Sequence, residues 1–103
     1  MVAHGDIWLA SLPGDKQRPV LIVSRDASIP VRNRVVVAPI TSTIREIPSC
    51  LSVGREHGLS EDGVATFDNL TTIPKRLLVH PIGTLGVGAR PKICAALSAV
   101  ADC

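Results

Sequence analysis

The sequence has few aromatic residues and no long apolar run. Of its 103 residues, only Trp8 and Phe67 are Trp, Phe or Tyr, which argues against a nucleic-acid module built on aromatic stacking platforms. No segment approaches the roughly 18 consecutive apolar residues of a membrane span. The N-terminus lacks the basic and apolar regions of a signal peptide. We therefore expect a cytoplasmic protein with no membrane partner.

Cysteine is also scarce. Cys50, Cys94 and Cys103 are odd in number and far apart, and the three histidines are equally scattered. No pair of these residues has the spacing of a zinc site. We therefore expect reduced thiols, no bound metal and no cofactor.

The hydrophobic fraction is 46% and the charged fraction 19%, which excludes a disordered chain. We expect residues 1–103 to form one small domain. A domain of this size buries only about two-thirds of its unfolded surface, so self-association would complete its core.

The net charge of +2 hides an uneven distribution. Residues 16–55 carry seven basic and two acidic side chains, a net charge of +5, between flanks of −2 and −1. Most of these basic residues are arginines, whose planar donor groups suit phosphate. For this stretch, a polyanionic partner and a set of solvated loop charges are about equally supported.

Short runs rich in Val, Ile and Thr alternate with turn residues. They predict strands over 6–12, 19–24, 34–40, 48–54, 64–67 and 77–85. The run at 19–24 is continuously apolar, as is typical of a strand buried on both faces. Segment 70–76 has mixed signals and contains Pro74, and we expect a loop or a single turn there.

The C-terminal segment has helical periodicity. From 89 to 101, Ile93, Leu97 and Val100 recur at helical spacing among alanines. Five to seven short strands followed by one helix predict a mainly β fold, a small and strongly bent sheet or barrel.

Two places in the sequence could carry chemistry. Arg18 precedes the most apolar strand, which would hold its guanidinium rigidly where it could stabilise a phosphoryl transition state. Thr41, Ser42 and Thr43 end the third predicted strand, where hydroxyls can donate to phosphate oxygens. Structural alternatives remain, because an arginine at a strand start can pair with a carboxylate and hydroxyl runs can form local turns.

Several segments resemble one family in the same order. They are Gly5-Asp6-Ile7-Trp8, residues 18–24 (RPVLIVS), residues 36–42 (VVAPITS), residues 63–73 (GVATFDNLTTI) and Ile82-Gly83-Thr84-Leu85. On these residues the chain resembles the MazF/PemK toxins, the mRNA interferases of bacterial toxin–antitoxin pairs. The resemblance implies an SH3-like barrel with a C-terminal helix, a homodimer, and metal-independent, sequence-specific cleavage of single-stranded RNA. The expected products carry a 2′,3′-cyclic phosphate and a 5′-hydroxyl.

The resemblance also assigns roles to residues. The family's catalytic arginine falls on Arg18 and its catalytic hydroxyl on Thr41, with Ser42 as the alternative. A carboxylate used by some members falls on Asp68, for which a general base and a turn or ion-pair residue are equally supported. The expected RNA-binding residues are Asp15, Lys16, Gln17, Ser42, Thr43 and Asn69. The first interstrand loop is shorter than in many relatives.

The resemblance implies a single-stranded RNA substrate, mRNA or alternatively tRNA or rRNA, and an acidic MazE-type antitoxin as partner. A different function on the same barrel is that of CcdB-like toxins, which bind and poison a protein target such as DNA gyrase. That function would place the critical residues on the terminal helix, whose end offers little besides Asp102 to grip a protein.

Overall fold

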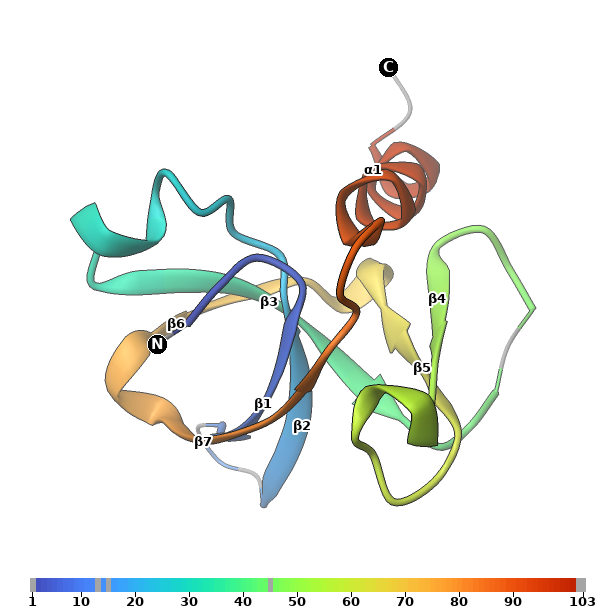
Figure 1. The fold of residues 1–103 in the computed structure, drawn as a ribbon, viewed down its shortest axis with the longest axis horizontal. Coiled ribbons are helices and arrows are strands. Elements are labelled where there is room, and N and C mark those ends of the chain that lie inside the picture. Colours follow the sequence, from blue (N-terminus) through green and yellow to red (C-terminus); the bar gives the residue numbers. More distant parts are fainter. Residues whose placement is uncertain (1, 13, 15, 45, 102–103) are drawn as a thin grey trace.

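Seven antiparallel strands and a C-terminal helix form the fold (Figure 1). The structure is a computed structural model, and it describes residues 2–12, 14, 16–44 and 46–101. The strands are β1 Asp6–Ser11, β2 Gln17–Ile22, β3 Arg34–Thr41, β4 Cys50–Val53, β5 Gly63–Thr66, β6 Thr71–Pro74 and β7 Leu78–Thr84, and the helix is α1 Ala89–Val100. Short 3-10 turns lie at η1 Ile29–Val31, η2 Arg55–His57, η3 Phe67–Asn69 and η4 Lys75–Leu77. The predicted mainly β class with a terminal helix is confirmed.

Strand β3 organises the sheet because it pairs with three other strands. The main strand order is β4-β5-β3-β2-β1-β7, and β6 pairs with β3 outside this path. The first half of β3 pairs with β6, from Arg34 opposite Pro74 to Val37 opposite Thr71. Its last residues, Ile40 and Thr41, pair with β5. The long strand β3 thereby joins β6 and β5, which pair with its first half and its end.

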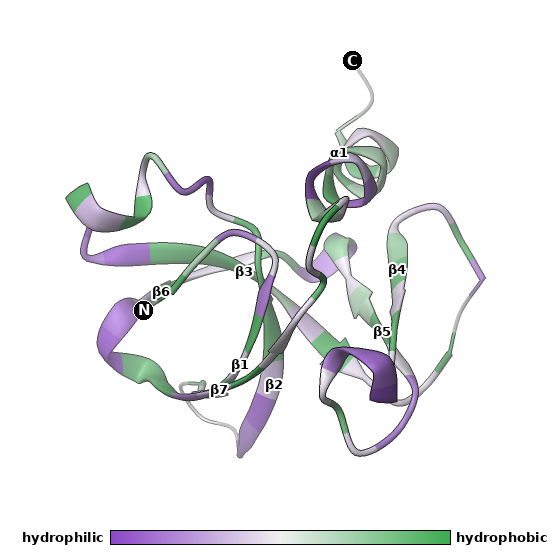
Figure 2. Ribbon diagram, viewed as in Figure 1, coloured by the Kyte–Doolittle hydropathy of each residue, from purple (hydrophilic) through white to green (hydrophobic). Residues whose placement is uncertain are grey.

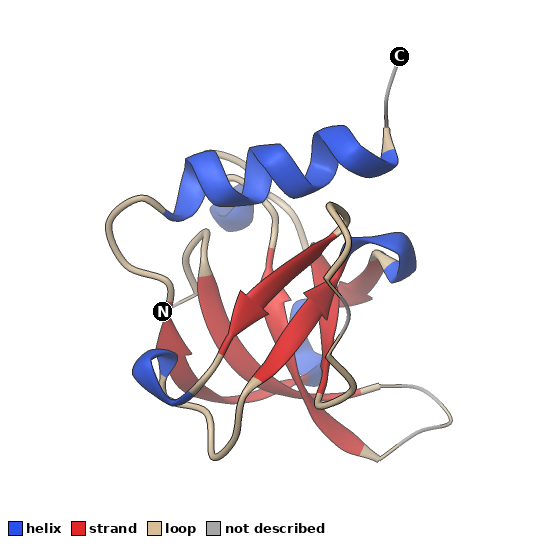
Figure 3. Cartoon of the chain, turned by 90° about the vertical axis from the view of Figure 1, so that its right-hand side faces the viewer, coloured by secondary structure: helices blue, strands red, loops and turns tan. Residues whose placement is uncertain are grey.

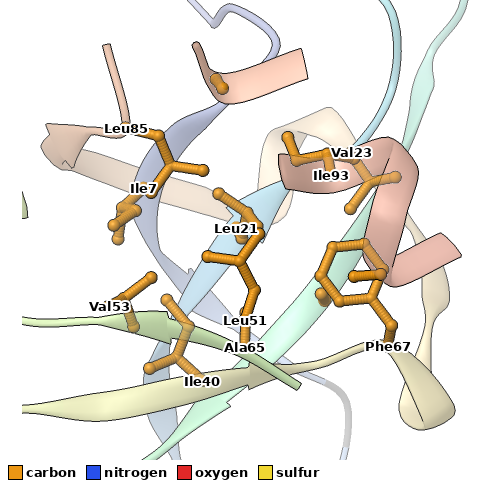
Figure 4. Close-up of a cluster of buried hydrophobic side chains, with 13 residues drawn as sticks. Ile7, Leu21, Val23, Ile40, Leu51, Val53, Ala65, Phe67, Leu85 and Ile93 are labelled. Carbon is orange, nitrogen blue, oxygen red and sulfur yellow. The ribbon is translucent and has the colours of Figure 1, made fainter. Parts of the chain in front are cut away.

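Two hydrophobic cores lie on opposite faces of β2. Leu21 belongs to one core, which includes Ile7, Phe67 and Ile93 (Figure 4). Val20 and Ile22 belong to the other core. All three β2 side chains are fully buried, because successive residues of a strand point to opposite faces. This confirms the expectation that the second strand is buried on both faces.

Helix α1 lies across one end of the sheet (Figure 3). It begins after Gly88, whose φ of +87° is a conformation that favours glycine. Ile93 and Ala96 of this helix are buried in the first core and Leu97 packs against it. Val100 is exposed at 36%, so the predicted apolar stripe ends one turn earlier than its sequence spacing indicated. No helix in the described part of the chain is long and apolar enough to cross a membrane.

The expectation of a loop or a single turn over 70–76 is wrong for residues 71–74 and holds for residues 75 and 76, which begin a 3-10 turn. The segment contains strand β6, followed by η4. Only Ile73 of the four β6 residues is buried, so apolar alternation is too short to reveal the strand. Pro74 is the last residue of β6, where its missing N–H is tolerated.

Candidate active site

Arg18 and Thr41 lie on neighbouring strands. The β2–β3 register pairs Val20 with Pro39 and Leu21 with Ala38. Arg18 lies two residues before Val20, and Thr41 lies two residues after Pro39, so both extend from the paired segments at the same end of the two strands. Both side chains are half-buried and share the strand face whose deeper residues fill the second core. A sheet pairing thus brings together two residues that are distant in sequence.

Two surface hollows share Arg18 and Thr41. We call the first the acidic hollow, lined by Arg18, Pro19, Ile40, Thr41, Ser42, Leu59, Ser60, Glu61, Asp62 and Gly63. We call the second the Asp68 hollow, lined by Arg18, Pro39, Thr41, Thr43, Ile47, Cys50, Thr66, Asp68 and Asn69. Arg18 and Thr41 therefore lie where the two hollows meet, and an extended ligand in both hollows could contact both residues.

The backbone around Thr41 orients its hydroxyl. Its Oγ1 accepts a hydrogen bond from the backbone N–H of Thr43 at 3.2 Å. A hydroxyl that accepts in this way keeps its own proton for donation. A Cβ at Gly63 would lie 2.4 Å from the Thr41 carbonyl oxygen, so only glycine lets β5 approach this closely. Thr41 is therefore positioned with a hydrogen available for a ligand oxygen.

Asp68 is held by a buried serine. The Oγ of Ser49 donates a hydrogen bond of 2.6 Å to Asp68 Oδ2, and Ser49 is only 7% exposed. The Ser49 carbonyl accepts from the backbone N–H of Phe67, which is itself buried. The exposed carboxylate of Asp68 is thereby fixed beside Arg18 and Thr41 in the Asp68 hollow.

The remaining predicted residues divide into three groups. Ser42 lines the acidic hollow, and Thr43 and Asn69 line the Asp68 hollow. Lys16 and Gln17 are exposed at the start of β2, outside the lining of both hollows. Asp15 lies outside the described residues.

The sequence patterns did not predict the acidic residues that line a hollow together with Arg18. Ser60, Glu61 and Asp62 come from the connection between β4 and β5 and line the acidic hollow. In the sequence they read as an ordinary polar loop between two glycines. Cys50, at the start of β4, was likewise not predicted in the Asp68 hollow. One sequence feature could have predicted Glu61 and Asp62 at this site. They directly precede Gly63, and the next residue, Val64 of β5, pairs with Thr41.

The described residues contain no group of three or more His, Cys, Asp or Glu side chains that could hold a metal ion. The polar residues that line the two hollows carry a guanidinium, hydroxyls, an amide and carboxylates. Guanidinium and hydroxyl groups are hydrogen-bond donors suited to phosphate oxygens.

Fold and site define a class: small, helix-capped β proteins that present an arginine and a threonine together in a surface groove. A family model described as the PemK-like, MazF-like toxin of type II toxin–antitoxin systems matches residues 3–101. The chain therefore belongs to the PemK-like, MazF-like family of toxins of type II toxin–antitoxin systems, and the predicted family is confirmed.

Curated relatives come from Mycobacterium tuberculosis. A protein named probable endoribonuclease MazF5 is 33% identical over 103 residues, covering 98% of this chain and 94% of its own length. The endoribonuclease MazF3 is 38% identical over 88 residues, covering 85% of both chains. These names agree with the predicted enzyme class.

Solved structures show the same fold. The Mycobacterium tuberculosis toxin MazF-mt6 superimposes with a TM-score of 0.86 and 37% identity, covering 94% of this chain and 96% of its own. An endoribonuclease from a mycobacterial species, in complex with its cognate antitoxin, has a TM-score of 0.82 and 27% identity, covering 97% and 94%.

Proposed function

We propose that the chain is a sequence-specific endoribonuclease that cleaves single-stranded RNA without a metal ion. The observation that carries this proposal is the meeting of Arg18, Thr41 and Asp68 in one hollow. Its substrate would be mRNA, with tRNA and rRNA as further candidates. The names of the curated relatives support the reaction class.

The reaction needs no nucleophilic side chain. The ribose 2′-oxygen attacks the adjacent phosphorus, the bond to the 5′-oxygen breaks, and the products are a 2′,3′-cyclic phosphate and a 5′-hydroxyl. The 2′-proton passes to a base and the leaving oxygen gains a proton, so charge and atoms balance. The protein must therefore supply proton transfer and donors for the crowded phosphate.

The three residues fit these tasks. The Arg18 guanidinium would stabilise the pentacoordinate phosphate and assist proton transfer, because charge accumulates on its non-bridging oxygens. The Thr41 hydroxyl, which accepts from Thr43 and keeps its proton, would donate to one of these oxygens, with Ser42 as the alternative donor. The Asp68 carboxylate, oriented by Ser49, would accept the 2′-proton as general base.

The flanking polar groups would bind the rest of the strand. Ser42, Thr43 and Asn69 line the two hollows and can reach phosphate, sugar or base edges. Lys16 and Gln17 would form the edge of this path at the start of β2, and Asp15 stays a predicted RNA-binding residue. These residues are the candidates for sequence preference.

We also propose a homodimer and a MazE-type antitoxin as partners. A mycobacterial neighbour of the same fold was solved with its cognate antitoxin. An acidic segment would be attracted by the net charge of +5 over residues 16–55. Capture of the toxin by such an antitoxin should weaken as salt rises, and capture insensitive to salt would contradict this electrostatic basis.

The nuclease is tested by incubating purified protein with long RNA in EDTA. We expect the wild type and the control Arg90→Ala, which changes an exposed arginine on α1, to cleave equally. Arg18→Ala and Thr41→Ala should lose cleavage while keeping the wild-type unfolding transition. Unchanged cleavage by Arg18→Ala would overturn the mechanism, and an inactive wild type would favour a protein-binding toxin of the CcdB type.

A further inference from the structure

A group of arginines lies outside both hollows of the candidate active site. Arg25, Arg32 and Arg34 are exposed and line one hollow between the β2–β3 connection and Leu97 of α1. Arg34 also lines a second hollow, together with Arg76. We call the surface formed by Arg25, Arg32, Arg34 and Arg76 the arginine shelf. Figure 2 colours the start of β3 and η4, which carry two of the four arginines, as hydrophilic on the same side of the molecule.

Among the residues that the structure describes, neither hollow of the arginine shelf is lined by Asp or Glu. None of the four arginines forms an ion pair with another described residue. The nearest acid in sequence, Asp26, accepts a 2.7 Å hydrogen bond from the backbone N–H of His4. Arginines that have no ion-pair partner among the described residues repel one another, which favours an anionic ligand.

The backbone that carries the arginine shelf is fixed in place. Ser24 Oγ accepts a hydrogen bond of 2.7 Å from the N–H of Val36, on β3. The ammonium group of Lys75, on η4, donates a 2.7 Å hydrogen bond to the carbonyl of Ile29. Ile29 is buried in the second core. The connection is therefore pinned to β3, to η4 and to the core, and a surface held in this way loses little entropy on binding.

A row of polar residues joins the arginine shelf to the candidate active site. Asn69 lines the Asp68 hollow, and Thr71 and Thr72 line the hollow of Arg34 and Arg76. Thr72 also lines the hollow of Arg25 and Arg32. Thr72 follows Asn69 by three residues, a separation of at most about 10 Å of extended chain. Their exposed amide and hydroxyl groups therefore form a short path from the catalytic residues to the arginines.

We propose that the arginine shelf binds backbone phosphates of the RNA strand on one side of the cut site. This inference rests on the proposed RNA-cleaving function. A strand carries a phosphate at each nucleotide, and both arginine forks and hydroxyl donors are typical contacts to phosphate and sugar oxygens. Because hydroxyl groups typically contact phosphate and sugar oxygens, the hydroxyls of Thr71 and Thr72 favour RNA over an acidic protein segment as the ligand. The arginine shelf thus adds affinity for longer RNA and leaves the chemical step to Arg18 and Thr41.

The test compares two variants that each lose two positive charges. Arg32→Gln/Arg34→Gln removes half of the arginine shelf, and Arg90→Gln/Lys92→Gln removes two exposed charges of α1. The probes are fully 2′-O-methylated single strands, which resist cleavage through the 2′-oxygen. One probe spans only the mapped cut site, and the others extend it on either side. Fluorescence anisotropy gives the affinity of each at several salt concentrations.

We expect extension on one side to strengthen binding by the wild type and by the α1 variant. The Arg32→Gln/Arg34→Gln variant should lose roughly tenfold in affinity for that extended strand. Its slope of log affinity against log salt should fall by about 1.4, because each phosphate contact to a single strand contributes about 0.7. Cleavage of the short strand, unmethylated, should be unchanged.

Equal affinities and slopes for the two variants would overturn the proposal. So would a shelf variant that keeps wild-type RNA binding but loses binding to a synthetic acidic peptide, because the arginine shelf would then serve a protein partner. If the wild type cuts no RNA, the proposed function fails. The contribution of the arginine shelf to RNA binding can still be measured with short and long probes of arbitrary sequence.

Discussion

The candidate active site and the arginine shelf both use arginine, but in different electrostatic settings. At the active site, Arg18 is half-buried and shares its hollows with Asp68, Glu61 and Asp62. On the arginine shelf, several exposed arginines line hollows in which none of the described lining residues is acidic. The active site therefore combines one arginine with carboxylates, whereas the described charged residues that line the arginine shelf are all positive.

This difference separates catalysis from binding. A transition state is stabilised by donors whose position is fixed in advance, and the pairing of β2 with β3 restricts the position of Arg18 and Thr41, which extend from the paired segments. A polyanion is attracted by the number of positive charges, with a strong dependence on salt. Substitutions at the active site should therefore change the chemical rate, and substitutions on the arginine shelf should change affinity and its salt dependence.

The largest effect is expected for Arg18→Lys. A lysine keeps the positive charge but cannot reproduce the planar fork of donors. The cleavage rate at saturating RNA should fall by roughly 10²- to 10³-fold, the cost of losing an oriented donor, while RNA affinity changes little. Single-turnover cleavage checks this. A lysine variant with the wild-type rate would show that Arg18 acts only through its charge.

Thr41→Val should have the next largest effect. Valine preserves the shape but removes the hydroxyl that accepts from Thr43, so a donor to the phosphate is lost and the rate should fall by roughly 10²-fold. Thr41→Ser restores the hydroxyl and should keep most of the activity. Equal rates for the two variants would assign the role of donor to Ser42.

A comparison of Asp68→Asn with Ser49→Ala tests whether the Asp68 carboxylate acts as the base and how much its orientation by Ser49 contributes. Asparagine cannot act as the base, so its rate should fall by roughly 10²-fold. Ser49→Ala removes only the orienting hydrogen bond, so its rate should fall several-fold and its unfolding free energy by about 1 kcal/mol. The cleavage rate is measured on samples quenched at successive times, and the unfolding free energy is measured by urea denaturation. Activity of Asp68→Asn equal to wild type would leave Asp68 a structural role.

The smallest effect is expected for Arg76→Gln, on the arginine shelf. The loss of one phosphate contact should lower the slope of log affinity against log salt by about 0.7, with cleavage of a short RNA unchanged. Arg90→Gln serves as the matched surface control. A slope equal to that of the control would limit the arginine shelf to the three remaining arginines.

Much of the fold could be predicted from the sequence, because short apolar runs and helical spacing carry a strong signal. Buried β2 is clear from its continuous apolar run, and the terminal helix from its periodicity. Strand β6 was missed because its pairing with β3 depends on backbone hydrogen bonds, while only Ile73 is buried. Short strands held by tertiary pairing leave little pattern in their own residues.

The site was predictable only in part. Arg18 and Thr41 stand beside conspicuous strand ends, so local patterns could suggest them. Glu61 and Asp62 come from a polar loop whose place is set by the β4–β5 pairing. Ser49 reads as an ordinary strand-start residue, and its bond to Asp68 joins segments 19 residues apart. Such long-range contacts become visible only in the folded chain.

The most direct test of the central claim replaces one oxygen in the RNA. A strand carrying the mapped cut site is made with a single 2′-deoxyribose on the 5′ side of the scissile phosphate, and every other nucleotide is unchanged. We predict that cleavage at this bond disappears, whereas a second, unmodified copy of the site in the same strand is cut at the normal rate. Continued cleavage at the 2′-deoxy position would contradict attack by the 2′-oxygen and the mechanism assigned to Arg18, Thr41 and Asp68.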